Sequence, residues 1–175
     1  GDLLFFSGNT FGEKSIKLYS RSYVSHVCII FLDKDIFSEK IIPYVWESDL
    51  GCNYKDGPRV MRLVDKLSRT KCERVCIWKK YLGPSIYTTA ILNVIPKYVD
   101  MDIDIHMLYW LFSSCPNSFA YKMFKKDDMI FCSELVASTL IDLDILETKN
   151  IPSWFSPQKL LELDKKYGIN RYVKF

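Results

Sequence analysis

Histidine and excess charge are both scarce in this 175-residue chain. It contains two histidines, His26 and His106, and its 24 basic and 21 acidic residues leave a formal charge of +3. We expect the lysine pairs at 79–80, 125–126 and 165–166 to lie on separate solvated faces, not in one basic patch. The charge therefore argues against a nucleic-acid partner. The shortage of histidine limits the candidates for a catalytic base to two residues.

The six cysteines lack the spacing of a disulfide framework. They stand at positions 28, 52, 72, 76, 115 and 132, and a chain of this length does not need disulfides to be stable. Cys72 and Cys76 resemble half of a zinc site, but no second pair or neighbouring histidine completes four ligands. We therefore expect reduced thiols, an intracellular and cytoplasmic location, and no metal or cofactor.

Long apolar runs, repeats and low-complexity linkers are also missing. The longest uncharged runs, 81–96 and 105–121, are broken by proline and are shorter than the ~20 residues that cross a bilayer. We expect one soluble domain over residues 1–175, with both runs in its core or, as the alternative, lining a groove for an acyl chain. The oligomeric state is left open.

Strand patterns dominate the first half of the chain, and helical patterns are more frequent in the second. The sequence predicts strands at 3–6, 25–31, 43–48, 59–64 and 74–81, and a closing edge strand at 170–175. It predicts helices at 10–19, 84–98, 132–143 and 157–168, with a short helix and a loop within 100–126. This order is typical of an α+β domain.

Cys132 is the cysteine best placed to act as a nucleophile. It opens the predicted helix 132–143, where the helix dipole favours a thiolate and free backbone N–H groups can bind an oxyanion. Cys28 and Cys76 lie inside predicted strands, and Cys115 precedes a proline. None of these three settings activates a thiol.

His26 and Glu47 are the candidates for the base and for the acid that orients it. His26 begins a predicted strand, where its ring can face a cleft at the rim of the sheet, whereas His106 stands in an aromatic stretch that suits a packing residue. Glu47 is a carboxylate inside an otherwise apolar strand, a position that calls for a partner. Asp33 and Asp49 are its rivals, and an outward-facing Glu47 is the other alternative.

Several motifs resemble those of a known family. The segments GDLLFF at 1–6 and SHVCIIF at 25–31 are similar to the GDLxFF and HVGI motifs of NlpC/P60-type papain-like thiol hydrolases. The cysteine helix FCSELVAS follows these motifs here, whereas it precedes them in ordinary members. This order resembles the circularly permuted branch, which includes YiiX/YebB-like and poxvirus-type enzymes and is related to lecithin–retinol acyltransferases. The late segment SPQKLLEL is similar to the terminal helix of that branch.

The resemblance implies a permuted papain-like fold, with an antiparallel sheet or half-barrel packed against the helix that carries the nucleophile. It also implies Cys132 as nucleophile, His26 as general base, Glu47 as orienting acid and Tyr121 as an oxyanion helper. The implied activity is hydrolysis of a peptide or amide bond through a thioester, without a metal or cofactor. The glycine that usually follows the HV pair is Cys28 here, which narrows the expected pocket near His26.

Two other functions stay open at this point. The same three residues could hydrolyse a lipid ester or transfer its acyl group, with the protein in peripheral contact with a membrane. The chain could also be a peptide- or lipid-binding module that kept the fold and lost turnover. The presence of all three catalytic residue types argues against this last reading.

Overall fold

The described part of the chain is built around one antiparallel sheet. The structure is a computed structural model, and it describes residues 1–35, 38–49, 56–70, 76–79, 88–103, 129–163 and 170–173. The strands are β1 (Asp2–Phe6), β2 (His26–Lys34), β3 (Ile41–Asp49), β4 (Gly57–Arg62), β5 (Cys76–Lys79) and β6 (Asn170–Val173). Their order is β4-β3-β2-β1-β5-β6, and each neighbouring pair is antiparallel.

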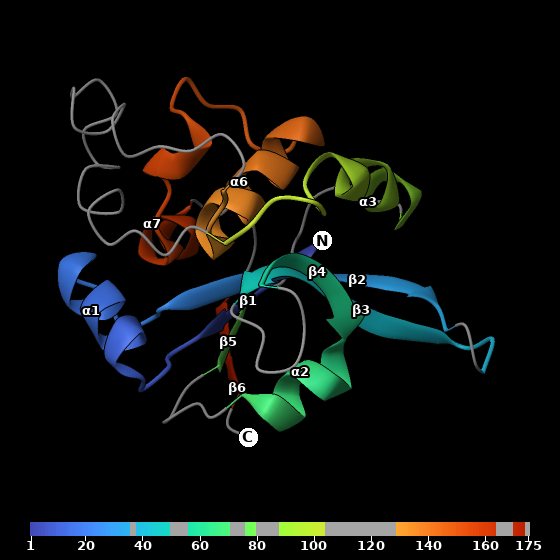
Figure 1. Cartoon of the computed structure of the whole chain (residues 1–175), viewed down its shortest axis with the longest axis horizontal. Helices are drawn as coiled ribbons and strands as arrows, with labels where there is room; N and C mark the ends of the chain where they lie inside the picture. The colour runs from blue at the N-terminus through green and yellow to red at the C-terminus, as the bar shows by residue number, and fades with distance from the viewer. Residues whose placement is uncertain are drawn as a thin grey trace.

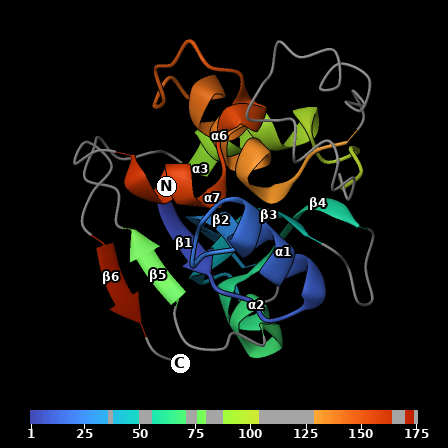
Figure 2. The same cartoon turned by 90° about the vertical axis from the view of Figure 1, so that its left-hand side faces the viewer.

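Helices cover both faces of this sheet. They are α1 (Phe11–Tyr19), α2 (Leu63–Arg69), α3 (Thr88–Val94), α6 (Cys132–Asp142) and α7 (Pro157–Glu162), with 3-10 turns at Ile95–Lys97 and Pro152–Trp154. Helices α3, α6 and α7 lie on one face, α2 lies on the other, and α1 lies at one end of the sheet (Figures 1 and 2). The described residues thus form an α+β fold, as the sequence predicts.

Local signals predicted several of these elements well. Thr10 and Glu13 form the expected capping box of α1, with the Glu13 carboxylate accepting the Thr10 N–H at 2.9 Å. The Ser156 hydroxyl caps α7 by accepting the Lys159 N–H at 3.2 Å. β6 pairs with β5 at the edge of the sheet. Most of the expected turn at 51–57, and most of 100–126, lie outside the described residues.

Helix α2 corrects the sequence prediction, which continued a strand through residue 64. The strand β4 ends at Arg62, and Leu63 begins a seven-residue helix. Arg62 provides no side-chain cap, so α2 depends on packing. Leu63 joins an apolar cluster with Leu4, Phe6 and Val45 on the α2 face of the sheet. That burial outweighs the local preference of a Val-rich segment for a strand.

Lys79 is a second correction, because it does not lie on a solvated face. It is 2% exposed, and its ammonium donates to the backbone oxygens of Leu160, Leu161 and Leu163 around the end of α7. The last carbonyls of a helix have no partner within the helix. A cation beside them is therefore well placed, and it links the strand β5 to α7.

Helix α6 is buried on all sides. Every residue from Ser133 to Leu140 is buried, because the sheet packs on one side of α6 and α3 and α7 pack around the other (Figure 1). The sequence predicted a single apolar stripe for this helix. The structure shows a helix that is enclosed by the fold, as its predominantly apolar composition allows.

Two buried hydrogen bonds hold α6 and the residues before it against β3. The Trp46 indole N–H donates to the Thr139 hydroxyl at 3.0 Å, and the Ser48 hydroxyl donates to the Ile130 carbonyl at 2.8 Å. Trp46 and Ser48 alternate along β3 with Glu47, so Glu47 points to the opposite face of the strand. β3 therefore holds α6 and Ile130 on one face and carries Glu47 on the other.

No helix in the described ranges is both long and apolar enough to cross a membrane.

Candidate functional site

His26 and Glu47 contact each other directly. The His26 Nε2 and Glu47 Oε2 atoms are 2.8 Å apart, and the Glu47 side chain is fully buried. A carboxylate can only accept, so Nε2 carries the hydrogen and donates. The β2–β3 register pairs Ile29 with Trp46. Continued by three residues, this register puts His26 opposite Asp49. Glu47 is two residues from Asp49, so the His26 and Glu47 side chains lie on the same face of the sheet. The antiparallel pairing is what brings these two residues together.

Cys132 is the first residue of α6, and its thiol lies close enough to His26 to raise the pKa of the histidine. Because Glu47 holds Nε2, the ring nitrogen left for the thiol is Nδ1. His26 is also the first residue of β2, so its ring lies at the end of the sheet, next to the start of α6. Cys132 is half-buried and packs against the hydrophobic core.

Three more charged residues complete a buried network around Glu47. The Lys66 ammonium lies 2.6 Å from Glu47 Oε2 and 2.8 Å from Asp49 Oδ2. The Arg59 guanidinium lies 3.1 Å from Glu47 Oε1 and 3.3 Å from Asp49 Oδ2. Two carboxylates thus face two permanent cations, and His26 approaches the Glu47 oxygen that Lys66 also contacts.

The charges in this network shift the pKa values of His26, Glu47 and Lys66. Burial and the Lys66 ammonium lower the pKa of His26, but the Asp49 carboxylate and Cys132 raise it to about 10. Burial would raise the pKa of Glu47, yet its hydrogen bond to His26 and the charges of His26 and Lys66 hold it well below its usual range. Burial would lower the pKa of Lys66, but Glu47 and Asp49 raise it. The network therefore favours an imidazolium and an ammonium held by carboxylates.

The structure brings together three of the four residues singled out in the sequence. Cys132, His26 and Glu47 meet, while Tyr121 lies outside the described residues, as does His106, so the role of Tyr121 stays a prediction. Asp49 was considered only as a rival of Glu47, and it shares the cluster with it. Asp33, the other rival, has its carboxylate accepting the Lys34 backbone N–H at 2.7 Å.

Sequence reasoning missed Lys66 and Arg59. Arg59 pairs with Glu47 in the β3–β4 register, so a hairpin prediction with the correct register would have found it. Lys66 comes from α2, which the sequence did not predict. A lysine is normally exposed to solvent, and the residues next to Lys66 in the sequence give no sign that it is only 6% exposed.

The donor atoms of His26, Glu47 and Asp49 are close enough to hold one metal ion, since they all lie within 4.8 Å of one another. One imidazole and two carboxylates are suitable ligands for zinc or manganese. The Lys66 Nζ atom, however, is 2.6, 2.8 and 3.4 Å from one atom of each of these residues. The ammonium therefore occupies the position of such an ion, and the group does not fit a metal while Lys66 stays there.

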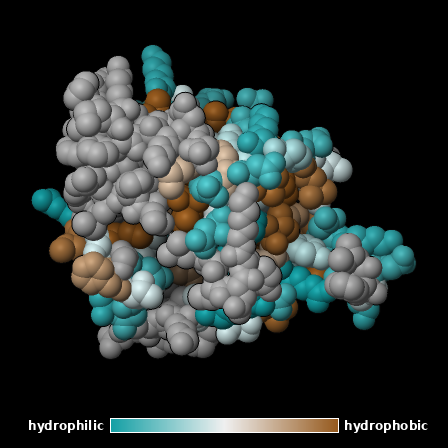
Figure 3. Space-filling view, in the orientation of Figure 1, coloured by the Kyte–Doolittle hydropathy of each residue, from teal (hydrophilic) through white to brown (hydrophobic). Residues whose placement is uncertain are grey.

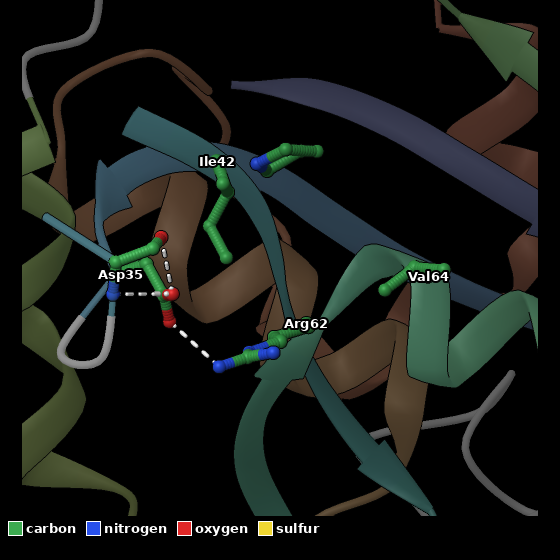
Figure 4. Close-up of a pocket in the computed structure, with 6 residues that line it drawn as sticks. Asp35, Ile42, Arg62 and Val64 are labelled. Carbon is green, nitrogen blue, oxygen red and sulfur yellow. Dashed lines mark hydrogen bonds and ion pairs between the residues drawn. The ribbon is translucent and has the colours of Figure 1, made fainter. Parts of the chain in front are cut away.

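A separate surface pocket lies at the opposite end of β2 from His26. It is lined by Asp35, Ser38, Ile42, Pro43, Arg62 and Val64 (Figure 4). Asp35 accepts hydrogen bonds from the Ser38 hydroxyl at 2.6 Å and from Arg62 at 2.7 Å. The polar groups of this pocket are paired with each other, so it carries no obvious catalytic set.

The fold and the site define the class of protein. It is an α+β domain with a cysteine at the start of a buried helix, beside a histidine on the sheet. No family model and no curated protein matches the sequence. Among solved structures, the fold is similar to that of the metalloprotein yiiX from Escherichia coli O157:H7, of the group DUF1105. The TM-score is 0.64 at 16% identity, over 99% of this chain and 94% of that one. This likeness shows a YiiX-like fold.

Proposed function

We propose that this protein is a papain-like thiol hydrolase in which Cys132 is the nucleophile, His26 the general base and Glu47 the residue that orients it. The observation that carries the proposal is the position of Cys132, at the first residue of α6 and beside a histidine that Glu47 holds by Nε2. The YiiX-like fold supports it, because the sequence motifs resemble the permuted NlpC/P60 branch of these enzymes.

The chemistry follows from the protonation of His26. The raised pKa of His26 favours an imidazolium, so we expect Nδ1 to hold the proton taken from Cys132 while Nε2–H donates to Glu47, and the thiolate then attacks the carbonyl carbon of an amide. Collapse of the tetrahedral intermediate breaks the C–N bond, and the imidazolium gives its proton to the leaving amine. Water, activated by His26, then hydrolyses the thioester and releases the acid and the thiol.

The start of α6 can also bind the oxyanion of the intermediate. The first N–H groups of a helix have no partner within it, and the N-cap residue Phe131 has an apolar side chain that cannot satisfy them. The N–H of Leu135, the fourth residue of the helix, donates to the Phe131 carbonyl at 2.9 Å. Donors of this kind, next to the nucleophile, contribute about 3 kcal/mol of transition-state stabilisation in other thiol and serine hydrolases.

The test is the rate at which iodoacetamide alkylates each cysteine near neutral pH, followed by mass spectrometry. Cys132 is expected to react fastest, and His26→Ala is expected to slow it by roughly a hundredfold. Exposed Lys34 of the same strand, substituted by alanine, is the control and should leave the Cys132 rate unchanged. Equal labelling of Cys132 in wild type and His26→Ala would count against an activated thiol. Peptide and amide probes would then show turnover.

A lipid substrate is the second candidate, favoured by the exposed face of α1. Phe11 and Leu18 are 86% and 83% exposed, seven residues apart on one face of the helix, and the exposed Lys14 lies between them. Helix α1 connects the end of β1 to His26, so this face lies at the same end of the sheet as the site. Figure 3 shows apolar surface at this end of the molecule. Apolar and basic side chains on one helix face suit an anionic lipid surface.

Vesicle binding tests the lipid candidate. Wild type is expected to sediment with vesicles that contain anionic phospholipid, and the double substitution Phe11→Ser and Leu18→Ser is expected to abolish this. Exposed Ile151, substituted by serine, is the matched control. Binding with release of a fatty acid would favour acyl chemistry. If wild type does not bind the vesicles, a peptide or amide is the favoured substrate.

The description of yiiX as a metalloprotein raises a third possibility, a bound metal in this chain. The ligands for it would be His26, Glu47 and Asp49. The Lys66 ammonium among these three residues argues against this. We therefore place no metal in the proposed reaction.

A further inference from the structure

Lys66 holds an unusual place for a lysine. Its side chain is 7% exposed, and its ammonium contacts two carboxylates, at 2.6 Å from Glu47 and 2.8 Å from Asp49. It also lies 5.3 Å from the centre of the Phe6 ring, which closes the site on one side. A lysine is rarely buried unless it is paired. The fold has therefore brought this cation to the carboxylates at a cost in desolvation.

The position of the ammonium is the one that a metal ion would need. A divalent ion bound by His26, Glu47 and Asp49 would lie roughly 2 Å from one atom of each. The Lys66 Nζ atom is already within 3.4 Å of those same atoms. Both cannot be present at once, because the volume is too small and the charges repel.

We propose that Lys66 is a positioning residue that serves as the built-in cation of the His26, Glu47 and Asp49 cluster and excludes metal from His26. The inference rests on the proposed thiol chemistry. A metal on His26 Nε2 would take the electron pair of that nitrogen and leave the hydrogen on Nδ1. The ring could then no longer accept the proton of Cys132. The ammonium lies 3.4 Å from Nε2 and balances the carboxylates. Unlike a metal, it does not take the electron pair of a ring nitrogen, so Nε2 stays a donor to Glu47 and Nδ1 faces the thiol.

The charges predict what removing Lys66 does. Glu47 and Asp49 would then lose a cation that contacts both of them, while the Arg59 guanidinium would remain at 3.1 and 3.3 Å from their oxygens. Lys66→Met keeps most of the volume of the side chain and removes its charge. The variant thereby combines an imidazole, two carboxylates and a deficit of positive charge, which is the environment that binds a divalent ion.

Mn²⁺ is the probe, because it prefers carboxylate and imidazole to the thiolate of Cys132. Lys66→Met is expected to bind one Mn²⁺ per chain, seen by electron paramagnetic resonance, about tenfold or more tightly than wild type. Mn²⁺ is also expected to slow iodoacetamide alkylation of Cys132 in this variant, and a chelator to restore it. Wild type and the control Lys34→Met, which removes an exposed lysine of β2, should show neither effect.

Several results would overturn the inference. The first is that wild type binds Mn²⁺ and its Cys132 is then no longer labelled. The second is that the Lys66→Met variant folds but does not bind Mn²⁺. If Lys66→Met does not fold, Lys66→Gln is the second variant, and Mn²⁺ during refolding should replace the missing cation. Failure of both variants to fold with Mn²⁺ would also overturn it. Slow labelling of Cys132 in wild type without metal would instead refute the proposed hydrolase.

Discussion

Glu47→Gln tests the charge network at its centre. The substitution keeps the shape of a side chain that is fully buried and removes the charge that His26, Lys66 and Arg59 contact at 2.8, 2.6 and 3.1 Å. An amide has one oxygen, so its NH₂ group must face cationic donors on one side. Removing one member of a buried ionic group costs about 3–5 kcal/mol. For a chain of this size, that corresponds to a melting temperature lower by roughly 10 °C.

The assay is urea unfolding at several pH values, with Glu39→Gln as the matched control. The Lys34–Glu39 pair is 3.6 Å long and solvent-exposed, with side chains 63% and 83% exposed, so its loss should cost less than about 1 kcal/mol. Glu47→Gln should also slow alkylation of Cys132, because the His26 imidazolium loses its acceptor.

The pH dependence has a definite sign. The pKa of Glu47 in the folded protein lies below its ordinary value of 4.5, because His26 and Lys66 stabilise the charged form. Its contribution to the free energy of unfolding is therefore complete above pH 4.5 and is lost as the pH falls through the folded value. The gap between wild type and Glu47→Gln should be constant near neutral pH and narrow below pH 4.5. A gap under about 1 kcal/mol at neutral pH, or one that widens in acid, would refute the ion-pair explanation.

Two further predictions concern His26 and the contact between α6 and β3. Since the pKa of His26 is raised from 6.5 to about 10 by Asp49 and Cys132, against burial and Lys66, its stabilisation is complete below pH 6.5 and is lost as the pH rises towards 10. The difference in unfolding free energy between wild type and His26→Gln should shrink over that range, and a difference that grows with pH would contradict this. Thr139→Val removes the acceptor of the buried Trp46 indole N–H and should cost about 1–3 kcal/mol, by calorimetry. The exposed Thr89 of α3, substituted by valine, is its control and should cost little.

Local chemistry made much of the fold predictable. The capping box of α1 needs only Thr10 and Glu13, three residues apart. Short runs of apolar, β-branched and aromatic residues predicted β1, β2 and β3, and Cys132 at the head of a helix followed from the pattern after it. Each of these signals lies within a few residues of the element that it specifies. They could therefore be read without knowing where the chain folds next.

Helix α2 and Lys66 could not be found in this way. The segment after Arg62 reads locally as a continuing strand, and it becomes helical because Leu63 packs against Leu4 and Phe6 from another strand. Lys66 is charged and would be expected at the surface. Its buried ammonium is instead stabilised by the carboxylates of Glu47 and Asp49. Both outcomes depend on residues far away in the sequence.

The sequence by itself determined which residue types were available for the proposed chemistry: a cysteine at a helix start, a histidine at a strand start and a glutamate in the next strand. Only the tertiary structure decided that they meet, because the β2–β3 register sets the His26–Glu47 contact and the docking of α6 sets that of Cys132. The tertiary structure also brought Lys66 into the cluster. Charges interact through space over a few ångströms, whatever their separation along the chain.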